Sequence, residues 1–310
     1  MARKGEKVDG WVVLDKPLGL SSAGAVAAVR RAFGAAKAGH AGTLDPLATG
    51  VLVVALGEAT KLVSFVMDAA KSYRFTVRWG EARATDDAEG AVVATSDHRP
   101  DRPAILAALQ PFVGSITQTP PVYSAIKVEG ARAYALARAG EVFEMAPRTV
   151  VISRFVLEAI EDTDHATFVV DCGKGTYVRS LARDLAQALG TVGHVAMLRR
   201  LAVGRFRAED AISLDKLEGV GHSPGRSATL RPVETALDDI PALAVNETAA
   251  QRLRHGQVVP LAEAHGSSPC DAPEFSQRGN APVAILAEGR LVALAAIGDG
   301  IIKPLRVFNL

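Results

Sequence analysis

Cysteine is scarce in this sequence, with only Cys172 and Cys270 among 310 residues. Two cysteines this far apart form neither a disulfide framework nor the paired spacing of a metal site. None of the seven histidines is followed by another four positions later, so the H-x-x-x-H spacing of helical metal ligands is missing too. We therefore expect a protein without a bound metal ion.

Long apolar runs are also missing, and none approaches the roughly 20 residues that a membrane-spanning helix needs. The N-terminal residues 1–7 are basic, but the apolar run that follows, Trp11–Leu14, is too short for the core of a secretion signal. Hydrophobic residues make up 48% of the chain, enough for a substantial buried core. We expect a cytoplasmic protein without membrane contact, built as two domains or as one large domain with an appendage.

The net charge is only +1, but the basic residues are unevenly distributed. Residues 174–207 contain seven basic side chains and a single acid, Asp184. A basic surface on a nearly neutral protein suits a polyanionic partner such as nucleic acid, although a solvated surface that only aids solubility has the same composition. The basic residues are Lys174, Arg179, Arg183, Arg199, Arg200, Arg205 and Arg207.

Apolar periodicity predicts strands that alternate with helices along most of the chain. Lys71–Trp79 alternates between apolar and polar residues, which is typical of a half-buried antiparallel strand. Ser21 or Ser22 and then Gly34 are suitable first and last residues for a helix over 23–33. This pattern favours an α+β fold with a mixed, mainly antiparallel sheet and flanking helices. Further strands are expected at 11–17, 51–56, 91–95, 123–128, 149–160, 166–172 and 195–206, further helices at 58–67, 101–109, 132–139 and 177–189, and a loop at 81–90.

The composition changes near residue 219. Residues 219–227 are rich in Gly, Ser and Pro and indicate a linker or exposed loop, and 264–280 indicates a second polar loop. After Pro241 the chain consists of short apolar runs, two of them joined by a hairpin turn at Glu288-Gly289. We expect residues 1–240 to form the main domain and residues 241–310 a small all-β domain.

The segment Gly39–Gly50 combines glycines and a proline with one histidine and one aspartate, and the apolar strand Val51–Leu56 follows it. A loop of this composition has a defined backbone. Asp45 is the only acid between Asp15 and Glu58, so it is a candidate catalytic carboxylate. By itself it fits better an aspartate that opens a turn or caps a helix, since Asp-Pro is common there.

Other candidates are also ambiguous when taken singly. His40 fits a base, a stacking ring or a structural hydrogen-bonding residue, and Tyr73 fits either a site or the core. The segment Gly173–Gly175 resembles a phosphate loop, but Phe168 stands where a Walker motif needs glycine and Gly175 where it needs Ser or Thr. No Ser/His/Asp order and no second carboxylate near Asp45 are present. What remains is a reaction, without an organic cofactor, in which an ionised aspartate is nucleophile or base.

Seven ordered segments resemble the bacterial TruB-type tRNA pseudouridine synthases. They cover about residues 10–206 and follow the family's order. Only Thr85, Asp87 and Gly90 fit the family's loop with two threonines, where this chain has Arg83-Ala84 before Thr85. Any role that the first threonine has in the family is therefore in question for this chain, whereas the catalytic motif is unaffected. The matching segments are Leu14–Pro17 with Ser21 and Ser22, Gly39–Leu52, Gly57–Lys61, Lys71–Arg74, Tyr123–Lys127, Gly173–Arg179 and His194–Leu201.

This resemblance implies that the protein isomerises uridine 55 in the T-loop of tRNA to pseudouridine, after the target base has been extruded from the folded RNA. Asp45 would be the nucleophile, attacking either the base or the ribose C1′. The ordinary pKa of an aspartate, about 3.9, leaves it ionised at neutral pH. Arg179 would pair with Asp45. Tyr73 would stack on the target ring and take the proton from its C5.

The same resemblance assigns the remaining contacts. Tyr177 and Leu198 would line the base pocket, and His40 would lie against the flipped-out nucleotides. Lys16, Lys174 and Arg199 would bind RNA, mainly through its phosphates. Residues about 120–150 would form an RNA-clasping insertion, with Lys127, Arg132, Arg138 and Arg148. The C-terminal segment resembles a PUA-like domain.

The expected partner is the T-arm of tRNA, bound by a monomer. Two alternatives remain at this stage. One is a catalytically idle RNA-binding or RNA-folding module with the same basic surface. The other is an aspartyl-phosphate enzyme, which needs a second carboxylate and Mg²⁺ beside Asp45.

Overall fold

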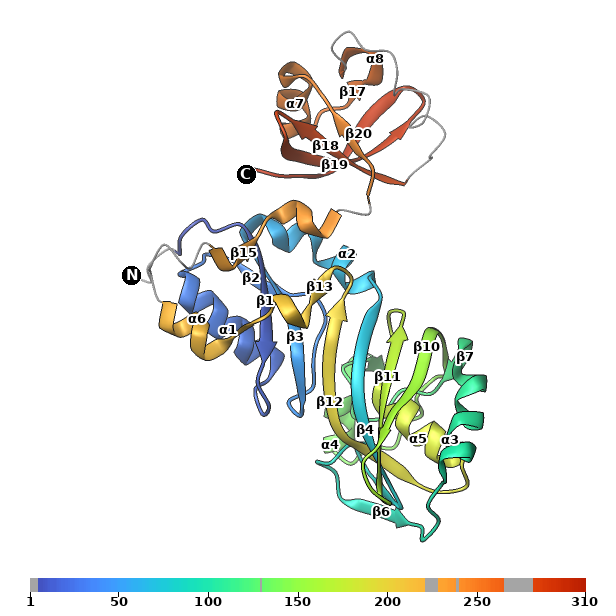
Figure 1. The fold of residues 1–310 in the computed structure, drawn as a ribbon. Coiled ribbons are helices and arrows are strands. Elements are labelled where there is room, and N and C mark those ends of the chain that lie inside the picture. Colours follow the sequence, from blue (N-terminus) through green and yellow to red (C-terminus); the bar gives the residue numbers. More distant parts are fainter. Residues whose placement is uncertain (1–4, 129, 221–227, 238–239, 265–280) are drawn as a thin grey trace.

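The computed structural model describes residues 5–128, 130–220, 228–237, 240–264 and 281–310 (Figure 1). An eleven-stranded mixed sheet forms the main body, and a separate five-stranded sheet follows it. The strands of the large sheet are β1 Gly10–Lys16, β2 Ala38–His40, β3 Ala48–Leu56, β4 Lys71–Trp79, β7 Gly114–Gln118, β10 Arg148–Ile160, β11 His165–Cys172, β12 Gly193–Val203, β13 Phe206–Arg207, β14 Ile212–Ser213 and β15 Leu230–Arg231.

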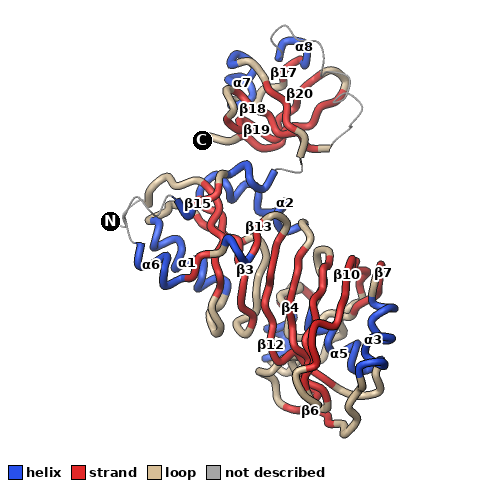
Figure 2. Tube along the Cα trace, in the orientation of Figure 1, coloured by secondary structure: helices blue, strands red, loops and turns tan. Residues whose placement is uncertain are grey.

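Helices flank this sheet (Figure 2). Two small hairpins accompany it. The hairpins are β5 Glu81–Arg83 with β6 Val92–Thr95, and β8 Lys127–Val128 with β9 Ala131–Arg132. The α-helices are α1 Ser22–Phe33, α2 Val63–Asp68, α3 Arg102–Leu109, α4 Ala133–Arg138, α5 Val178–Ala188 and α6 Leu214–Val220, and the 3₁₀ turns are η1 Gly57–Leu62, η2 Gln110–Phe112, η3 Ala208–Asp210 and η5 Val233–Leu237.

The large sheet runs in the order β14-β1-β3-β12-β4-β11-β10-β7. Most neighbours are antiparallel, but β14 lies parallel to β1 and β12 lies parallel to β3. The pairing with β3 brings β12 between β3 and β4, although both of those strands precede it by more than 100 residues. In the resulting register Arg200 lies opposite Gly50 on one side and opposite Tyr73 on the other. Residues from three distant segments therefore meet at the centre of the sheet.

The sequence patterns explain most of these elements. Ser21 begins α1 by accepting a hydrogen bond from the Gly24 N–H at 3.1 Å, and Gly34 ends the helix in the left-handed region with φ of 59°. Asp101 caps α3 in the same way as Ser21. The continuous apolar run of β3 is buried on both faces, by α1 and α6 on one side and by Val66, Val233 and the C-terminal sheet on the other.

A second core fills the other half of the main body. The inward side chains of β4, β11 and β10 pack there against α3 and α5. Phe75 stacks on Phe168 with ring centroids 5.6 Å apart, and Trp79 meets the edge of the same ring. Because Arg179 lies on α5, this packing fixes the height of its side chain above the sheet.

The C-terminal residues form a curled sheet in the order β16-β18-β19-β20-β17, as expected for a β unit. Glu288 and Gly289 both have positive φ in the hairpin between β18 and β19, which confirms the predicted turn. The unit is not purely β, because two short helices accompany the sheet and the side chain of Asn246 caps the first. The elements are β16 Ala242–Ala244, α7 Glu247–Arg254, β17 Val259–Pro260, α8 Leu261–Ala264, β18 Pro282–Ala287, β19 Arg290–Gly298 and β20 Ile301–Val307.

Four other expectations need adjustment. Of the strand expected at 123–128, only Lys127–Val128 forms a strand, β8. The helix expected at 58–67 begins as the 3₁₀ turn η1, and the loop expected at 81–90 starts with the strand β5. In the expected linker, Gly219 belongs to α6, while 221–227 lie outside the described residues. The expected polar loop falls outside them as well, from 265 to 280. Within the described ranges, no helix is both long and apolar enough to cross a membrane.

Candidate active site

Asp45 lies on the loop between β2 and β3, and this loop is held by hydrogen bonds from α1 and β1. The buried Ser22 hydroxyl accepts the Leu44 N–H at 2.8 Å and donates to the Leu44 carbonyl at 2.9 Å. The ammonium of Lys16 and the N–H of Gly19 both donate to the Pro46 carbonyl. The residues on either side of Asp45 are therefore fixed, and its carboxylate has a defined direction.

Arg200 supports the same loop from β12. Its side chain is 1% exposed and donates to the carbonyls of Val51 at 2.7 Å and of Thr43 and Gly42 at 3.2 Å each. In the sequence, Arg200 stands out only as a member of the basic run 174–207. One feature of the sequence could have predicted that Arg200 is buried. Neighbouring residues of a strand point to opposite faces of the sheet, so Arg199 and Arg200 cannot share one solvent-facing side.

Gly50 provides a close contact between β12 and the start of β3, just after this loop, and its replacement is a test of loop placement. Gly50 has φ of 96°, and a Cβ there would lie 2.2 Å from the Arg200 carbonyl oxygen. We expect Gly50→Ala to lower the free energy of unfolding by about 2 kcal/mol or more, because strain at positive φ adds to a backbone clash. Gly39→Ala is the matched control, since a Cβ at Gly39 meets nothing within 4 Å. Chemical denaturation of both variants measures the difference, and equal stabilities would contradict the prediction.

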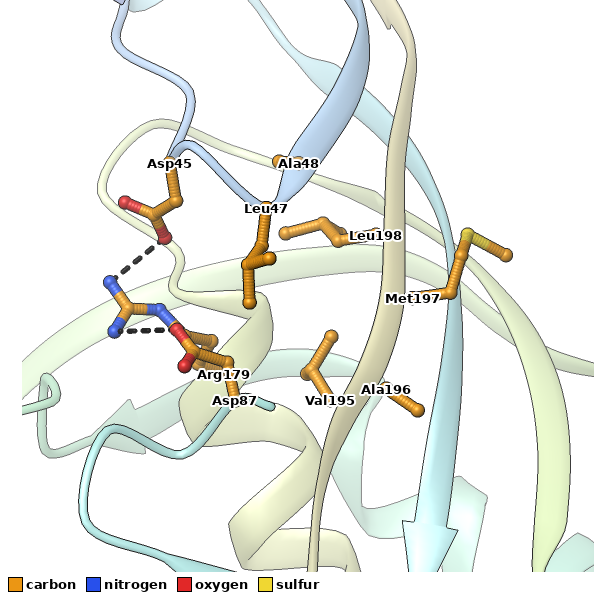
Figure 3. Close-up of a pocket in the computed structure, with 9 residues that line it drawn as sticks. All are labelled: Asp45, Leu47, Ala48, Asp87, Arg179, Val195, Ala196, Met197 and Leu198. Atoms are coloured by element: carbon orange, nitrogen blue, oxygen red, sulfur yellow. Dashed lines mark ion pairs between the residues drawn. The ribbon is translucent and has the colours of Figure 1, made fainter. Parts of the chain in front are cut away.

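The Asp45 carboxylate forms an ion pair with Arg179 at 2.9 Å (Figure 3). Arg179 also lies 3.4 Å from the Asp87 carboxylate and donates to the carbonyls of Thr85 and Tyr123. The side chains of Arg179 and Asp87 are 6% and 9% exposed, whereas that of Asp45 is 44% exposed. The guanidinium is thus fixed from behind, and it directs a solvent-accessible carboxylate.

The loop that carries Asp87 is ordered without the first threonine of the family's pattern. Thr85 donates its hydroxyl hydrogen to the Asp87 carboxylate and accepts the Gly90 N–H at 2.9 Å. Arg83 donates to the Ala88 and Gly90 carbonyls. Arg83 therefore belongs to the hydrogen bonding that shapes this loop.

Two adjoining cavities open beside Asp45, and both are lined by Asp45, Arg179 and Leu198. The smaller extends along β12 towards Val195 and Met197 (Figure 3). The larger measures about 290 Å³ and is also lined by Tyr73, Tyr177, Arg148 and Arg200. The structure therefore brings together five predicted site residues, which are Asp45, Tyr73, Tyr177, Arg179 and Leu198.

Tyr73 lies half-buried on β4 at the wall of the larger cavity. Burial of its hydroxyl raises the pKa of Tyr73 above the ordinary value, while the nearby Arg200 guanidinium opposes this shift. The phenol is therefore neutral at pH 7. A neutral phenol suits stacking on an aromatic base better than it suits direct acceptance of a proton.

Four other predicted site residues do not line either cavity. Lys16 is 0% exposed, and its ammonium donates to the carbonyls of Pro17, Leu20 and Pro46. Burial lowers the pKa of Lys16 to about 8, so the ammonium keeps its charge at pH 7. Lys16 therefore has no exposed surface that RNA could contact, and its hydrogen bonds hold the Asp45 loop instead.

Arg199 and Lys174 are on the surface, each in an ion pair. Arg199 donates two hydrogen bonds to the Asp15 carboxylate, at 2.9 and 3.0 Å. Lys174 is 66% exposed and lies 3.0 Å from the Asp68 carboxylate. His40 lies on β2, and burial together with Arg200 lowers its pKa. The buried His40 Nδ1 has no hydrogen-bond partner within the described residues.

The arrangement suits nucleophilic chemistry on a flat ring. An ionisable carboxylate points towards a cavity with aromatic and apolar walls, and a buried guanidinium fixes it. In the described part of the chain, no group of three or more His, Cys, Asp or Glu side chains could hold a metal ion.

Comparison with known proteins identifies relatives over the whole chain. The family described as "TruB family pseudouridylate synthase (N terminal domain)" matches residues 30–178, and "tRNA pseudouridylate synthase B C-terminal domain" matches residues 179–238. "tRNA pseudouridine synthase B" of Bradyrhizobium diazoefficiens is 57% identical, over 98% of this chain and 86% of its own. The protein of the same name from Rhodospirillum rubrum is 52% identical, over 99% of both chains.

Solved structures give the same assignment of fold. A crystal structure of a Cbf5-Nop10-Gar1 complex contains a chain with a TM-score of 0.72 and 25% identity, which covers 97% of this chain and 85% of the other. A chain in an archaeal box H/ACA sRNP Nop10-Cbf5 complex has a TM-score of 0.71 at 24% identity, with coverages of 97% and 86%. With family matches across the core of the chain and relatives above 50% identity, this chain belongs to the TruB family of pseudouridylate synthases.

Proposed function

We propose that this protein isomerises uridine 55 in the T-loop of tRNA to pseudouridine. The single observation that carries the proposal is the Asp45 carboxylate, which Arg179 holds at the mouth of a cavity lined by Tyr73, Tyr177 and Leu198. The names of the relatives, which act on tRNA, support the substrate class.

Asp45 is the proposed nucleophile. In the reaction the bond between N1 and the ribose C1′ breaks, the base turns, and a bond forms between C5 and C1′. The proton on C5 leaves, and N1 gains one, so the product is an isomer of the substrate. The carboxylate forms its transient bond either to C1′ or to the base ring. Arg179 fixes Asp45, and the cavity walls restrict how the detached base moves.

Tyr73, Tyr177 and Leu198 are proposed to hold the extruded base. Tyr73 is the proposed stacking partner, since its ring is at the cavity wall and its hydroxyl is neutral. A cavity of about 290 Å³ is at the small end of the range for ligand sites, which suits a single flipped base.

The proposed RNA-binding surface surrounds this cavity. It includes Lys174 on the loop before α5 and Arg148 at the start of β10. Residues 119–147, between β7 and β10, are the proposed RNA-clasping insertion, with Lys127, Arg132 and Arg138. The C-terminal unit is the proposed PUA-like contact to the rest of the tRNA. His40 is assigned to the same surface by family resemblance alone.

We further propose that the protein acts as a monomer in the cytoplasm. The proposed nucleophile, its arginine partner and the residues proposed to hold the base already meet within a single chain, so the proposed chemistry requires no residue from a second copy. Light scattering of the purified protein with tRNA tests the monomer, and a two-to-one complex would contradict it.

The proposed function is tested with the wild-type protein and an unmodified tRNA transcript. We expect pseudouridine at position 55, detected by carbodiimide labelling and primer extension. A transcript with cytidine at position 55 should give no product at any position. Binding without any product would instead favour an RNA-binding or RNA-folding module.

Lys174 allows a separate test of the basic surface. We expect Lys174→Glu to weaken tRNA binding by about tenfold at low salt and to lose most of that effect at high salt, because exposed charges act through screened phosphate contacts. The control is Lys216→Glu, an equally large charge change at an exposed position of α6. Filter binding at several ionic strengths measures both, and equal salt slopes for the two variants would contradict the prediction.

A further inference from the structure

Gln118 makes two hydrogen bonds to the backbone of Tyr177. The Tyr177 N–H donates to Gln118 Oε1 at 2.8 Å, and Gln118 Nε2 donates to the Tyr177 carbonyl at 3.1 Å. Gln118 is 1% exposed, so its side chain reaches Tyr177 from within the protein. Tyr177 is the residue before α5, and no side-chain hydrogen bond of its own caps that helix.

Arg148 contacts the other end of the same residue. Its guanidinium carbon lies 5.3 Å from the centre of the Tyr177 ring, within range of a cation–π contact. Arg148 on β10 is the register partner of Gln118 on β7. One cross-strand pair therefore holds both the backbone and the ring of Tyr177.

This pair also closes the stem of the insertion. β7 ends at Gln118 and β10 begins at Arg148, so the chain leaves the sheet at one residue of the pair and returns at the other. At the base of the insertion, Arg148 therefore lines the cavity directly, and Gln118 holds Tyr177, which lines it as well.

We infer that Gln118 and Arg148 are positioning residues that set the orientation of Tyr177 against the target base. The inference rests on the proposed function and adds the residues through which the stem of the insertion contacts the base pocket. Neither residue is needed as an acid, base or nucleophile. Their effect on the reaction passes through Tyr177.

A double-mutant cycle tests this role. We expect Gln118→Met to lower the single-turnover rate about 10- to 100-fold, because small misplacements of a positioning group have effects of this size. The affinity for tRNA should stay within about threefold. In a Tyr177→Ala background the same substitution should change the rate by less than about twofold, since residues that act through one another are not additive. A full loss in both backgrounds would overturn the inference, because Gln118 would then act through the fold alone.

Arg148→Lys keeps the test decisive if Gln118→Met unfolds the protein. Lysine retains the charge but loses the planar group that contacts the ring. We expect a rate reduced about three- to tenfold with an unchanged midpoint of thermal unfolding, and no further loss in the Tyr177→Ala background. A wild-type rate for Arg148→Lys would overturn the role of Arg148. The activity of the wild-type protein distinguishes the two proposals. If the wild-type protein forms no pseudouridine, the proposed function and the inference are both overturned. If the wild-type protein is active but the effects of the two substitutions are additive, only the inference is overturned.

Discussion

Asp45→Asn should abolish pseudouridine formation while leaving tRNA binding within about twofold of the wild type. We expect the rate to fall by at least about 10⁴-fold, as when the nucleophile of other enzymes is removed. Asparagine has nearly the same shape as aspartate, and its carbonyl still accepts a hydrogen bond from Arg179, so the loop should keep its place. Binding should survive because the proposed phosphate contacts are made by other side chains, Lys174 and Arg148, which the substitution leaves in place.

The measurement is a single-turnover assay with enzyme in excess, combined with a binding assay on the same tRNA. Asp215→Asn serves as the control, because it removes a carboxylate from an exposed position of α6. Product at the wild-type rate from Asp45→Asn would show that another group is the nucleophile. Loss of binding together with activity would show instead that the substitution disturbs the loop.

Arg179→Lys should reduce the rate by about 100-fold or more and also destabilise the protein. Lysine retains the charge, but its single ammonium cannot contact the Asp45 and Asp87 carboxylates and the carbonyls of Thr85 and Tyr123 together. A displaced Asp45 carboxylate accounts for the loss of rate, since misplacement by about 1 Å can cost a factor of 10². The buried Asp87 carboxylate would then have a weaker ion pair, which accounts for the loss of stability.

Arg183→Lys is the matched control for Arg179→Lys. Arg183 lies one turn further along α5 and also forms an ion pair, with Asp86 at 2.8 Å, but it does not line either cavity. Its replacement should leave the rate close to that of the wild type. Arg179→Met extends the series, because it removes the charge and should lower the free energy of unfolding by about 3 kcal/mol or more. A stable and fully active Arg179→Met protein would refute the proposed role of this ion pair.

The surroundings of Tyr73 favour one of the two roles that the family resemblance implies for it. The resemblance allows both stacking and acceptance of the C5 proton. Burial raises the pKa of Tyr73, and a raised pKa leaves less phenolate at neutral pH, which weakens the tyrosine as a base. Stacking does not depend on the protonation state, so it is the role that the structure supports better.

Much of the fold follows from local patterns in the sequence. The alternation over Lys71–Trp79, the apolar run of β3 and the caps of α1 and α3 each depend on neighbouring residues only, and each is present as predicted. The helix α7 was not predicted because it is short and carries few apolar residues, so its periodicity is weak. A helix was predicted over η1, but the sequence pattern did not distinguish a 3₁₀ turn from an α-helix. The C-terminal hairpin was predictable from its turn residues.

The candidate site likewise contains some features that the sequence predicts and others that it does not. The sequence by itself marked Asp45 and the loop around it, and resemblance to a family supplied the pairing with Arg179 that the structure shows at 2.9 Å. The sequence did not predict three other features of the site. These are the inward direction of Lys16, the hydrogen bonds of Arg200 to the Asp45 loop and those of Gln118 to Tyr177.

Only the tertiary structure decided these last three features. Each joins segments between 30 and 158 positions apart in the chain, and each depends on which strands become neighbours and in which register. A shift of one residue in the pairing of β12 would turn Arg200 to the opposite face and leave the Asp45 loop without its support. Local sequence thus determined that a carboxylate would stand on a shaped loop before a buried strand, and the sheet register determined which side chains hold and direct it.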